Sequence, residues 1–155
     1  MKKYKIYFAG SIRGGREDVD LYLQMIEHLK KYGEVFTEHV GDRNLALLGE
    51  DNIDNTYICE RDLTWIAQSD VFIAEITTAS YGVGFETREA VDLKKQILLL
   101  YRQQEGKIFS AIGAGYPTWK GITDWYKLRY YNTIDEAKLH IDQFFSELTT
   151  RNNTQ

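Results

Sequence analysis

With 155 residues, 43% of them hydrophobic and 27% charged, the chain has the composition of one soluble globular domain, expected over 1–150 with a frayed tail at 151–155. The net charge of −4 disfavours a nucleic-acid polymer as partner, because such proteins usually carry a basic face, but a small anionic ligand remains possible. The single cysteine, Cys59, excludes an intrachain disulfide and a cysteine-based zinc cluster. No apolar stretch approaches membrane-spanning length and the first residues lack a signal-peptide pattern, so we expect a cytoplasmic protein without a membrane partner.

The first expected strand, residues 5–9, ends in a glycine-rich turn. That turn contains Gly10, Ser11, Ile12, Arg13 and Gly14. Backbone N–H groups in such a turn before a helix bind anions, although neither the Walker nor the dinucleotide-binding spacing is present. Arg13 adds a planar donor fork suited to phosphate, and a solvated surface arginine is an equally good interpretation.

A helix follows over residues 19–32, with Gly33 as its expected C-cap, and a second strand over 34–40. His39 lies near the end of that strand and could contact a ligand, but a surface role is favoured for a lone histidine. Residues 41–55 form a long polar connection.

A second helix is expected over residues 56–68, with Cys59, Leu63, Ile66 and Ala67 on its buried side. Asp62 lies at the border of that apolar face, where a carboxylate suits proton donation. An ion pair with Arg61 explains Asp62 equally well.

The central stretch, residues 70–86, reads DVFIAEITTASYGVGFE. Its apolar run at 71–76 predicts a strand buried on both faces of a parallel sheet. Ser80, Gly82 and Gly84 then predict a loop, and Glu86 is expected in the first turn of the following helix, with Phe85, Ala90 and Leu93 on one side. The helix dipole would hold Glu86 ionised, as a nucleophile requires, but acidic residues are common in first turns for the same electrostatic reason, and that interpretation is favoured on this stretch alone.

The remaining elements are a strand at 96–101, a short helix at 107–115, a strand at 125–131 and a last helix that Thr133 caps. Its apolar residues are Ala137, Ile141, Phe144, Phe145 and Leu148. Alternating strands and helices predict a single-domain, three-layer α/β fold of Rossmann or flavodoxin-like type with a five-stranded parallel sheet. The loops after the first and third strands should meet at one edge of that sheet.

Four motifs together resemble one family: KIYFAGSIRGG, TEHVGD, ERDLTW and SYGVGFETREAV. The chain is similar through most of 4–112 to the 2′-deoxynucleoside 5′-phosphate N-hydrolases, relatives of the nucleoside 2-deoxyribosyltransferases. Segment 113–124 departs from the family's pattern. The resemblance implies a homodimer that cleaves the N-glycosidic bond of a nucleoside monophosphate, and neither a cofactor nor a metal ion is expected.

The resemblance also implies roles for individual residues. Glu86 takes the position of the nucleophile, Asp62 that of a second essential carboxylate, and Tyr7 that of a tyrosine close to the nucleophile. Sugar and phosphate contacts fall on Ser11, Ile12, Arg13, Ser80 and Gly82. Apart from the resemblance, Gly10 and Gly14 in the first loop and His39 near the end of the second strand are also expected to contact the substrate. Ser110 matches a serine that reaches the phosphate in the partner subunit.

The residue types fit that chemistry: an adjacent carboxylate stabilises the oxocarbenium-like transition state, and an acid protonates the departing base. Three alternatives remain at this point. A deoxyribosyltransferase acting on free nucleosides would not need the phosphate loop at 11–15. A ribonucleotide N-glycosidase of the CMP type would differ only around the second carbon of the sugar. A non-catalytic nucleotide-binding protein would not need both carboxylates.

Overall fold

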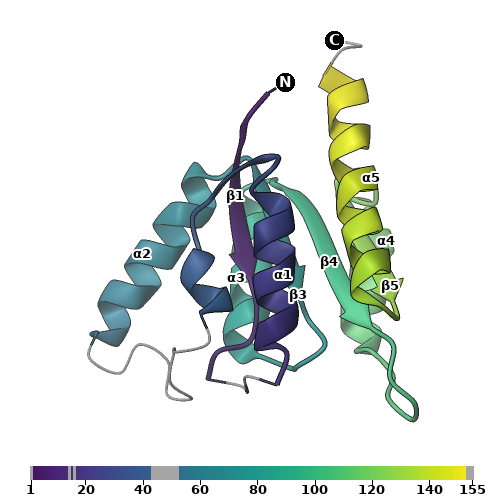
Figure 1. Ribbon diagram of the computed structural model, residues 1–155, viewed down its shortest axis with the longest axis horizontal. Coiled ribbons are helices and arrows are strands. Elements are labelled where there is room, and N and C mark those ends of the chain that lie inside the picture. The colour runs from purple at the N-terminus through teal and green to yellow at the C-terminus, as the bar shows by residue number, and fades with distance from the viewer. Residues whose placement is uncertain (1, 14, 16, 43–52, 153–155) are drawn as a thin grey trace.

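The computed structural model describes residues 2–13, 15, 17–42 and 53–152 (Figure 1). In these ranges the elements are β1 (Tyr4–Ala9), α1 (Val19–Leu29), β2 (Gly33–Val35), the 3-10 helix η1 (Glu38–Gly41), α2 (Asn55–Gln68), β3 (Val71–Glu75), α3 (Tyr81–Asp92), β4 (Gln96–Arg102), α4 (Ala111–Lys120), β5 (Tyr126–Tyr131) and α5 (Ile134–Asn152). Within the same ranges, no helix is both long and apolar enough to cross a membrane.

The strands form one parallel sheet in the order β2-β1-β3-β4-β5, which confirms the predicted fold class. The chain moves from β1 outward to β2 and then returns to place β3 on the other side of β1. This order makes the boundary between β1 and β3 the topological switch point, where open parallel sheets bind ligands beyond the carboxyl ends of their strands.

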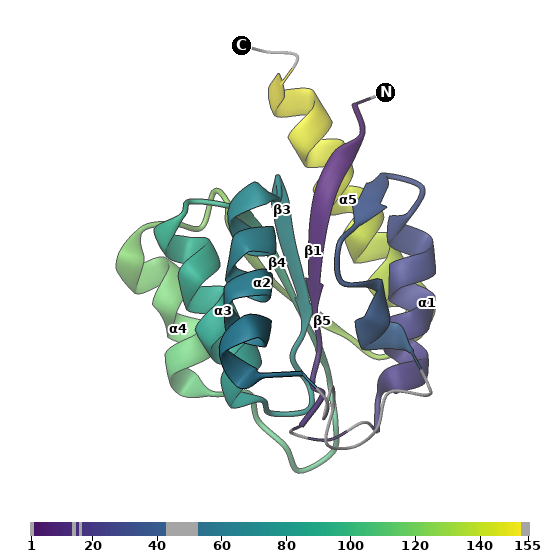
Figure 2. The same ribbon diagram turned by 90° about the vertical axis from the view of Figure 1, so that its left-hand side faces the viewer.

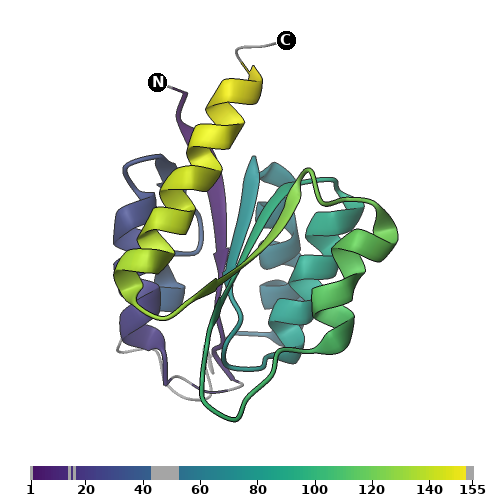
Figure 3. The same ribbon diagram turned by 90° about the vertical axis from the view of Figure 1, so that its right-hand side faces the viewer.

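Helices cover both faces of the sheet, α1 and α5 on one face and α2, α3 and α4 on the other (Figures 2 and 3). Alternate residues of each strand enter opposite core layers: Ile6 and Phe8 pack toward α1 and α5, whereas Tyr7 and Phe72 pack toward α2 and α3. Burial on both faces explains why the central strands β3 and β4 consist mainly of apolar residues. The apolar residues expected on the last helix are all buried.

The second strand is shorter than predicted, because a side chain takes over its hydrogen bonding. β2 ends at Val35, and the Thr37 hydroxyl accepts from the backbone N–H of Phe8 at 2.8 Å and donates to the Phe8 carbonyl at 2.5 Å. These bonds replace a strand ladder and let the chain turn into η1, which contains His39. Gly33 is the first residue of β2 rather than a C-cap; a Cβ there would lie 1.8 Å from the Tyr4 carbonyl oxygen, so the close strand approach requires glycine.

The helix after β3 begins earlier than predicted. The Ser80 hydroxyl accepts a hydrogen bond from the Val83 N–H at 3.3 Å and caps α3, so Gly82 and Gly84 are helical and Glu86 lies in the second turn. Phe85 is 57% exposed and Leu93 41%, contrary to the expected buried side.

Two other boundaries also differ from the expectation. The helix expected at 107–115 is α4, which extends to Lys120. The tail expected to fray from Arg151 is helical through Asn152, and the Arg151 guanidinium donates to the Asp124 carbonyl at 2.7 Å.

Candidate active site

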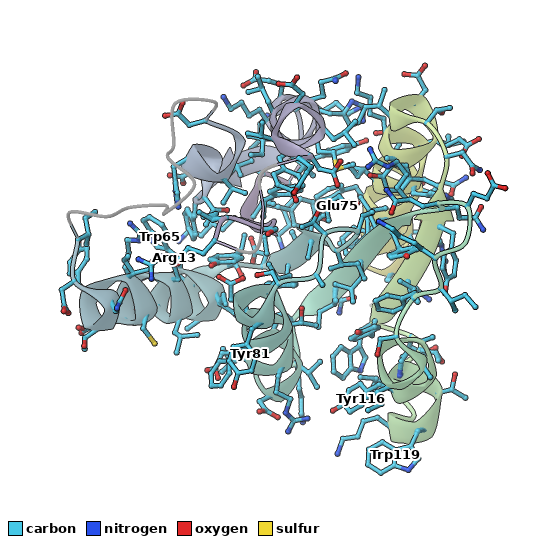
Figure 4. All side chains as sticks on the ribbon, turned by 90° about the horizontal axis from the view of Figure 1, so that it is seen from below. Arg13, Trp65, Glu75, Tyr81, Tyr116 and Trp119 are labelled. Atoms are coloured by element: carbon cyan, nitrogen blue, oxygen red, sulfur yellow. The ribbon has the colours of Figure 1, made fainter. Side chains whose placement is uncertain are left out.

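A cavity of about 460 Å3 opens at the carboxyl edge of the sheet, next to the switch point. It is lined by residues 10, 12 and 13 after β1, by one side of α2 and by the first turns of α3. Figure 4 looks onto this edge and shows Arg13 beside α2 and Tyr81 on α3. The loops after β1 and β3 therefore meet where the sequence predicted.

Glu86 lies in this cavity and accepts a hydrogen bond from the Tyr7 hydroxyl, at 2.7 Å on Oε1. Tyr7 is buried in the sheet layer beneath it, with its ring stacked on Phe72 at 5.6 Å between centroids. Burial raises the pKa of Tyr7 far above its ordinary value, and the charge of Glu86 adds to that effect, so the phenol stays a neutral donor. The pair joins β1 to α3 directly above the switch point.

Glu86 does not have the low pKa that a helix dipole would give it. Burial raises its pKa to about 7; the hydrogen bond from Tyr7 lowers it, and the negative charge of Asp62 raises it further. The dipole acts mainly within the first turn, and Glu86 is in the second, so desolvation prevails. The expectation that Glu86 is simply held ionised was therefore wrong.

Asp62 shares the cavity with Glu86 and is also ion-paired with Arg61, so the ion-pair interpretation is confirmed and the role in proton donation stays a prediction. Its Oδ1 accepts from Arg61 Nε at 2.9 Å, and the two side chains are only 18% and 14% exposed. The Arg61 guanidinium lies over the Trp65 ring, 4.8 Å from its centroid. Stacking and ion pairing together fix the carboxylate on the cavity side of α2.

The loop residues divide into those that line the cavity and those that do not. Gly10, Ile12 and Arg13 line it, and Arg13 Nη1 donates to Asn55 Oδ1 at 3.0 Å. Ser11 is fully buried instead: its N–H donates to the Tyr22 hydroxyl at 3.2 Å, and within the described residues its Oγ has no hydrogen-bond partner. Gly14, expected in the same loop, falls outside the described residues.

Ser80 and Gly82 line the cavity from α3, and both were predicted to contact the ligand. His39, in contrast, is not part of the described lining; its ring packs against Trp65 at 6.1 Å. In the described ranges, no group of three or more His, Cys, Asp or Glu side chains is arranged to hold a metal ion.

Ser110 lies outside this cavity. It caps α4 by accepting from the Gly113 N–H at 3.3 Å, and it lines a second cavity of about 580 Å3 between α3 and α4. The two cavities adjoin, because Ser80 and Val83 line both.

Several lining residues were not anticipated from the sequence. Cys59 and Phe85 were expected in the core, but both are exposed and line the cavity, and Asn55 and Ile58 join them from α2. Apolar periodicity identifies the side of a helix that faces apolar surroundings, and it does not distinguish a core from a ligand cavity.

The chain is thus an α/β protein in which a cavity at the switch point of a parallel sheet is lined by two carboxylates, Asp62 and Glu86. Residues 6–144 match the family model described as nucleoside 2-deoxyribosyltransferase. The chain belongs to that family.

Similar proteins agree with this assignment. A Nematostella vectensis protein named as a candidate 2′-deoxynucleoside 5′-phosphate N-hydrolase is 53% identical over 113 residues, 72% of this chain and 76% of that one. The 5-hydroxymethyl-dUMP N-hydrolase of Rattus norvegicus is 42% identical over 142 residues, 90% of this chain and 83% of the rat protein. The solved structure of the CMP N-glycosidase BcmB of Clostridium botulinum shares the fold at 20% identity, with a TM-score of 0.63 over 90% of this chain and 98% of that chain.

Proposed function

We propose that this protein hydrolyses the N-glycosidic bond of 2′-deoxynucleoside 5′-monophosphates, giving a free base and deoxyribose 5-phosphate. The observation that carries the proposal is the Tyr7–Glu86 hydrogen bond in a cavity that also holds Asp62. The named activities of the rat and Nematostella relatives support the same reaction class. A volume of about 460 Å3 is in the range that accommodates a small-molecule ligand.

In the proposed mechanism, ionised Glu86 attacks the anomeric carbon as the bond from that carbon to the base nitrogen breaks. For this step Asp62 first takes up a proton from solvent and then donates it to the departing base, and the product is a glycosyl ester on Glu86. Water, deprotonated by Asp62, then hydrolyses the ester with overall retention. The hydrogen bond from Tyr7 orients the Glu86 carboxylate.

The phosphate is proposed to lie among the backbone of Gly10–Ile12, the Arg13 guanidinium and the first turn of α3. This end of the cavity combines the planar guanidinium of Arg13 with the positive end of the α3 dipole, both of which favour phosphate. Binding energy from this remote group would orient the sugar over Glu86.

We also propose that two copies of the chain pair through α3 and the segment leading into α4, so that Ser110 reaches the partner's phosphate. Large apolar side chains are unusually exposed in this region: Ile108 is 96% exposed, Tyr81 90% and Ile112 81%. An exposed apolar surface of this kind is typical of a subunit interface.

Incubation with each deoxy- and ribonucleoside, with and without the 5′-phosphate, tests the proposal when base release is followed by chromatography. Deoxynucleoside monophosphates should react far faster than the other compounds.

Glu86→Ala should lower the rate of base release by several decades. Glu89→Ala, one turn further along α3 and outside both cavities, should leave the rate near the wild-type value. Transfer of the sugar to an added free base at the rate of hydrolysis would favour a transferase instead, and base release by Glu86→Ala within tenfold of the wild type would remove the nucleophile role.

A further inference from the structure

Glu75 is a fully buried carboxylate that the proposed mechanism does not use. It is 0% exposed, at the carboxyl end of β3, and the predicted apolar run 71–76 passed over it. Burying a carboxylate is costly, and replacing a buried ionic group by apolar residues of similar volume is often neutral or stabilising. Stability alone is therefore a weak explanation for an acid at this position.

The hydrogen bonds of Glu75 connect the ends of three strands. Its Oε1 accepts from the Thr77 hydroxyl and from the Tyr131 hydroxyl, the latter at 2.9 Å, and its Oε2 accepts from the Thr77 N–H at 3.3 Å. The Thr77 hydroxyl in turn accepts from the Arg102 N–H at 2.7 Å. The first residues of the β3–α3 loop are thus tied to the ends of β4 and β5.

A second set of contacts connects that loop to the one after β1. The Arg102 guanidinium donates to Asp18 Oδ1 at 2.7 Å, and the Thr78 hydroxyl donates to Asp18 Oδ2 at 3.3 Å. Asp18 is itself only 4% exposed and directly precedes α1. These contacts form a continuous network, which we call the Glu75 network: Glu75, Thr77, Tyr131, Arg102, Asp18 and Thr78.

The loop after β1 rests on a neighbouring residue, Tyr22 of α1. The Tyr22 hydroxyl accepts from the Ser11 N–H at 3.2 Å, and a Cβ on Gly10 would lie 3.0 Å from its ring. Burial raises the pKa of the Tyr22 hydroxyl, and the negative charge of Glu75 raises it further. Tyr22 and the Glu75 network therefore occupy the same layer, beneath both loops.

We propose that Glu75 is a positioning residue for the phosphate subsite. Lying on the sheet face opposite Glu86, it holds the β1–α1 and β3–α3 loops at a fixed distance from each other. The inference rests on the proposed function, because those loops carry the proposed phosphate contacts at Arg13 and Ser80. Strand alternation places Glu75 toward α1 and Tyr7 toward α3, and Glu75 lines neither of the two described cavities. Figure 4 shows Glu75 near the middle of the molecule, apart from Arg13 and Tyr81.

Three variants test this role. Glu75→Gln replaces one acceptor oxygen by an amide donor that faces the donors of Thr77. Tyr131→Phe keeps the aromatic ring and removes the hydroxyl that donates a hydrogen bond to Glu75. Tyr32→Phe is the matched control: it removes a tyrosine hydroxyl that donates to Asp142 at 2.5 Å, between α1 and α5 and away from both loops. If Glu75→Gln fails to fold, Tyr131→Phe carries the test.

The readouts are the KM and kcat for thymidine 5′-monophosphate and thymidine, with calorimetric titration of both compounds. We expect Glu75→Gln and Tyr131→Phe to raise the KM and Kd of the monophosphate about tenfold, with a smaller change in kcat and little change for thymidine. Tyr32→Phe should leave KM, kcat and Kd for both compounds near the wild-type values. A merely structural role would move the two compounds together, or would give Tyr32→Phe the same effect.

The two proposals fail in different ways. If the wild type cleaves thymidine monophosphate but folded Tyr131→Phe binds it as tightly as the wild type, the positioning role is overturned and the proposed function stands. If the wild type binds the monophosphate without cleaving it, the proposed function fails and the Kd values still decide the role of Glu75. If the wild type neither binds nor cleaves any nucleoside monophosphate, both are overturned.

Discussion

A nucleophilic carboxylate must be ionised, and burial makes ionisation of Glu86 costly. Because burial raises the Glu86 pKa to about 7, kcat/KM should fall about tenfold per pH unit below 7 and level off above it. The Tyr7 hydrogen bond lowers this pKa, so Tyr7→Phe should move the inflection upward by up to about one unit. A 13C NMR titration of the Glu86 side chain without substrate provides the control, since a phosphate monoester titrates near pH 6 itself. An inflection near 4.5 in both proteins would contradict the assignment.

The same burial predicts a cost in stability at high pH. The folded-state pKa of Glu86 is raised from 4.5 to about 7, so its favourable contribution is complete below pH 4.5 and is lost as the pH rises through 7. Glu86→Gln keeps an oxygen that can accept from Tyr7 and cannot ionise. It should therefore exceed the wild type in free energy of unfolding by up to about 3 kcal/mol at pH 8, with the gap opening between about pH 4.5 and 7. Urea unfolding at several pH values measures it, and a gap that does not vary with pH would contradict burial as the cause.

At the scale of the elements, the N-termini of α2 and α3 offer a matched comparison. Ser80 caps α3 through the Val83 N–H at 3.3 Å, and Asp54 caps α2 through the Tyr57 N–H at 3.1 Å. Replacement of either cap by alanine should cost about 1 kcal/mol of stability. Only Ser80 lines the cavity, so only Ser80→Ala should also raise the KM for a deoxynucleoside monophosphate. Equal effects of the two variants on KM would show that capping alone is responsible.

At the scale of the whole molecule, the proposed dimer predicts complementation between inactive subunits. Glu86→Ala removes the proposed nucleophile of its own site, and Ser110→Trp is designed to block the partner's proposed phosphate subsite. A hybrid dimer then has one site with both defects and one with neither, so activity should partly return on mixing. Sedimentation measures the association state. Only monomer at assay concentration, or no recovery after subunit exchange, would contradict the shared site.

The architecture and the meeting of the main candidate residues at one edge of the sheet were predictable from the sequence. Its β-branched apolar runs predict parallel strands buried on both faces, and their alternation with helices predicts the layers, because these patterns depend on local spacing alone. The adjacency of the loops after β1 and β3 follows from that topology, and it brings Glu86, Asp62 and Arg13 to one cavity. The resemblance to the family identified Tyr7 as the neighbour of Glu86.

The solvation and hydrogen bonding of these residues depend on contacts between elements that are distant in the sequence. Thr37 ends β2 through its bonds to Phe8, a residue 29 positions away in the sequence, so no local pattern could reveal it. The exposure of Cys59 and Phe85 and the raised pKa of Glu86 depend on the gap between α2 and α3, which periodicity within one helix does not describe. In the sequence, Glu75 is a single polar residue in an apolar strand. Its hydrogen-bond network forms only because Thr77, Arg102 and Tyr131 come together from separate elements. Local sequence specifies which surface an element can bury, whereas solvation at a site depends on which surfaces the other elements bring to it.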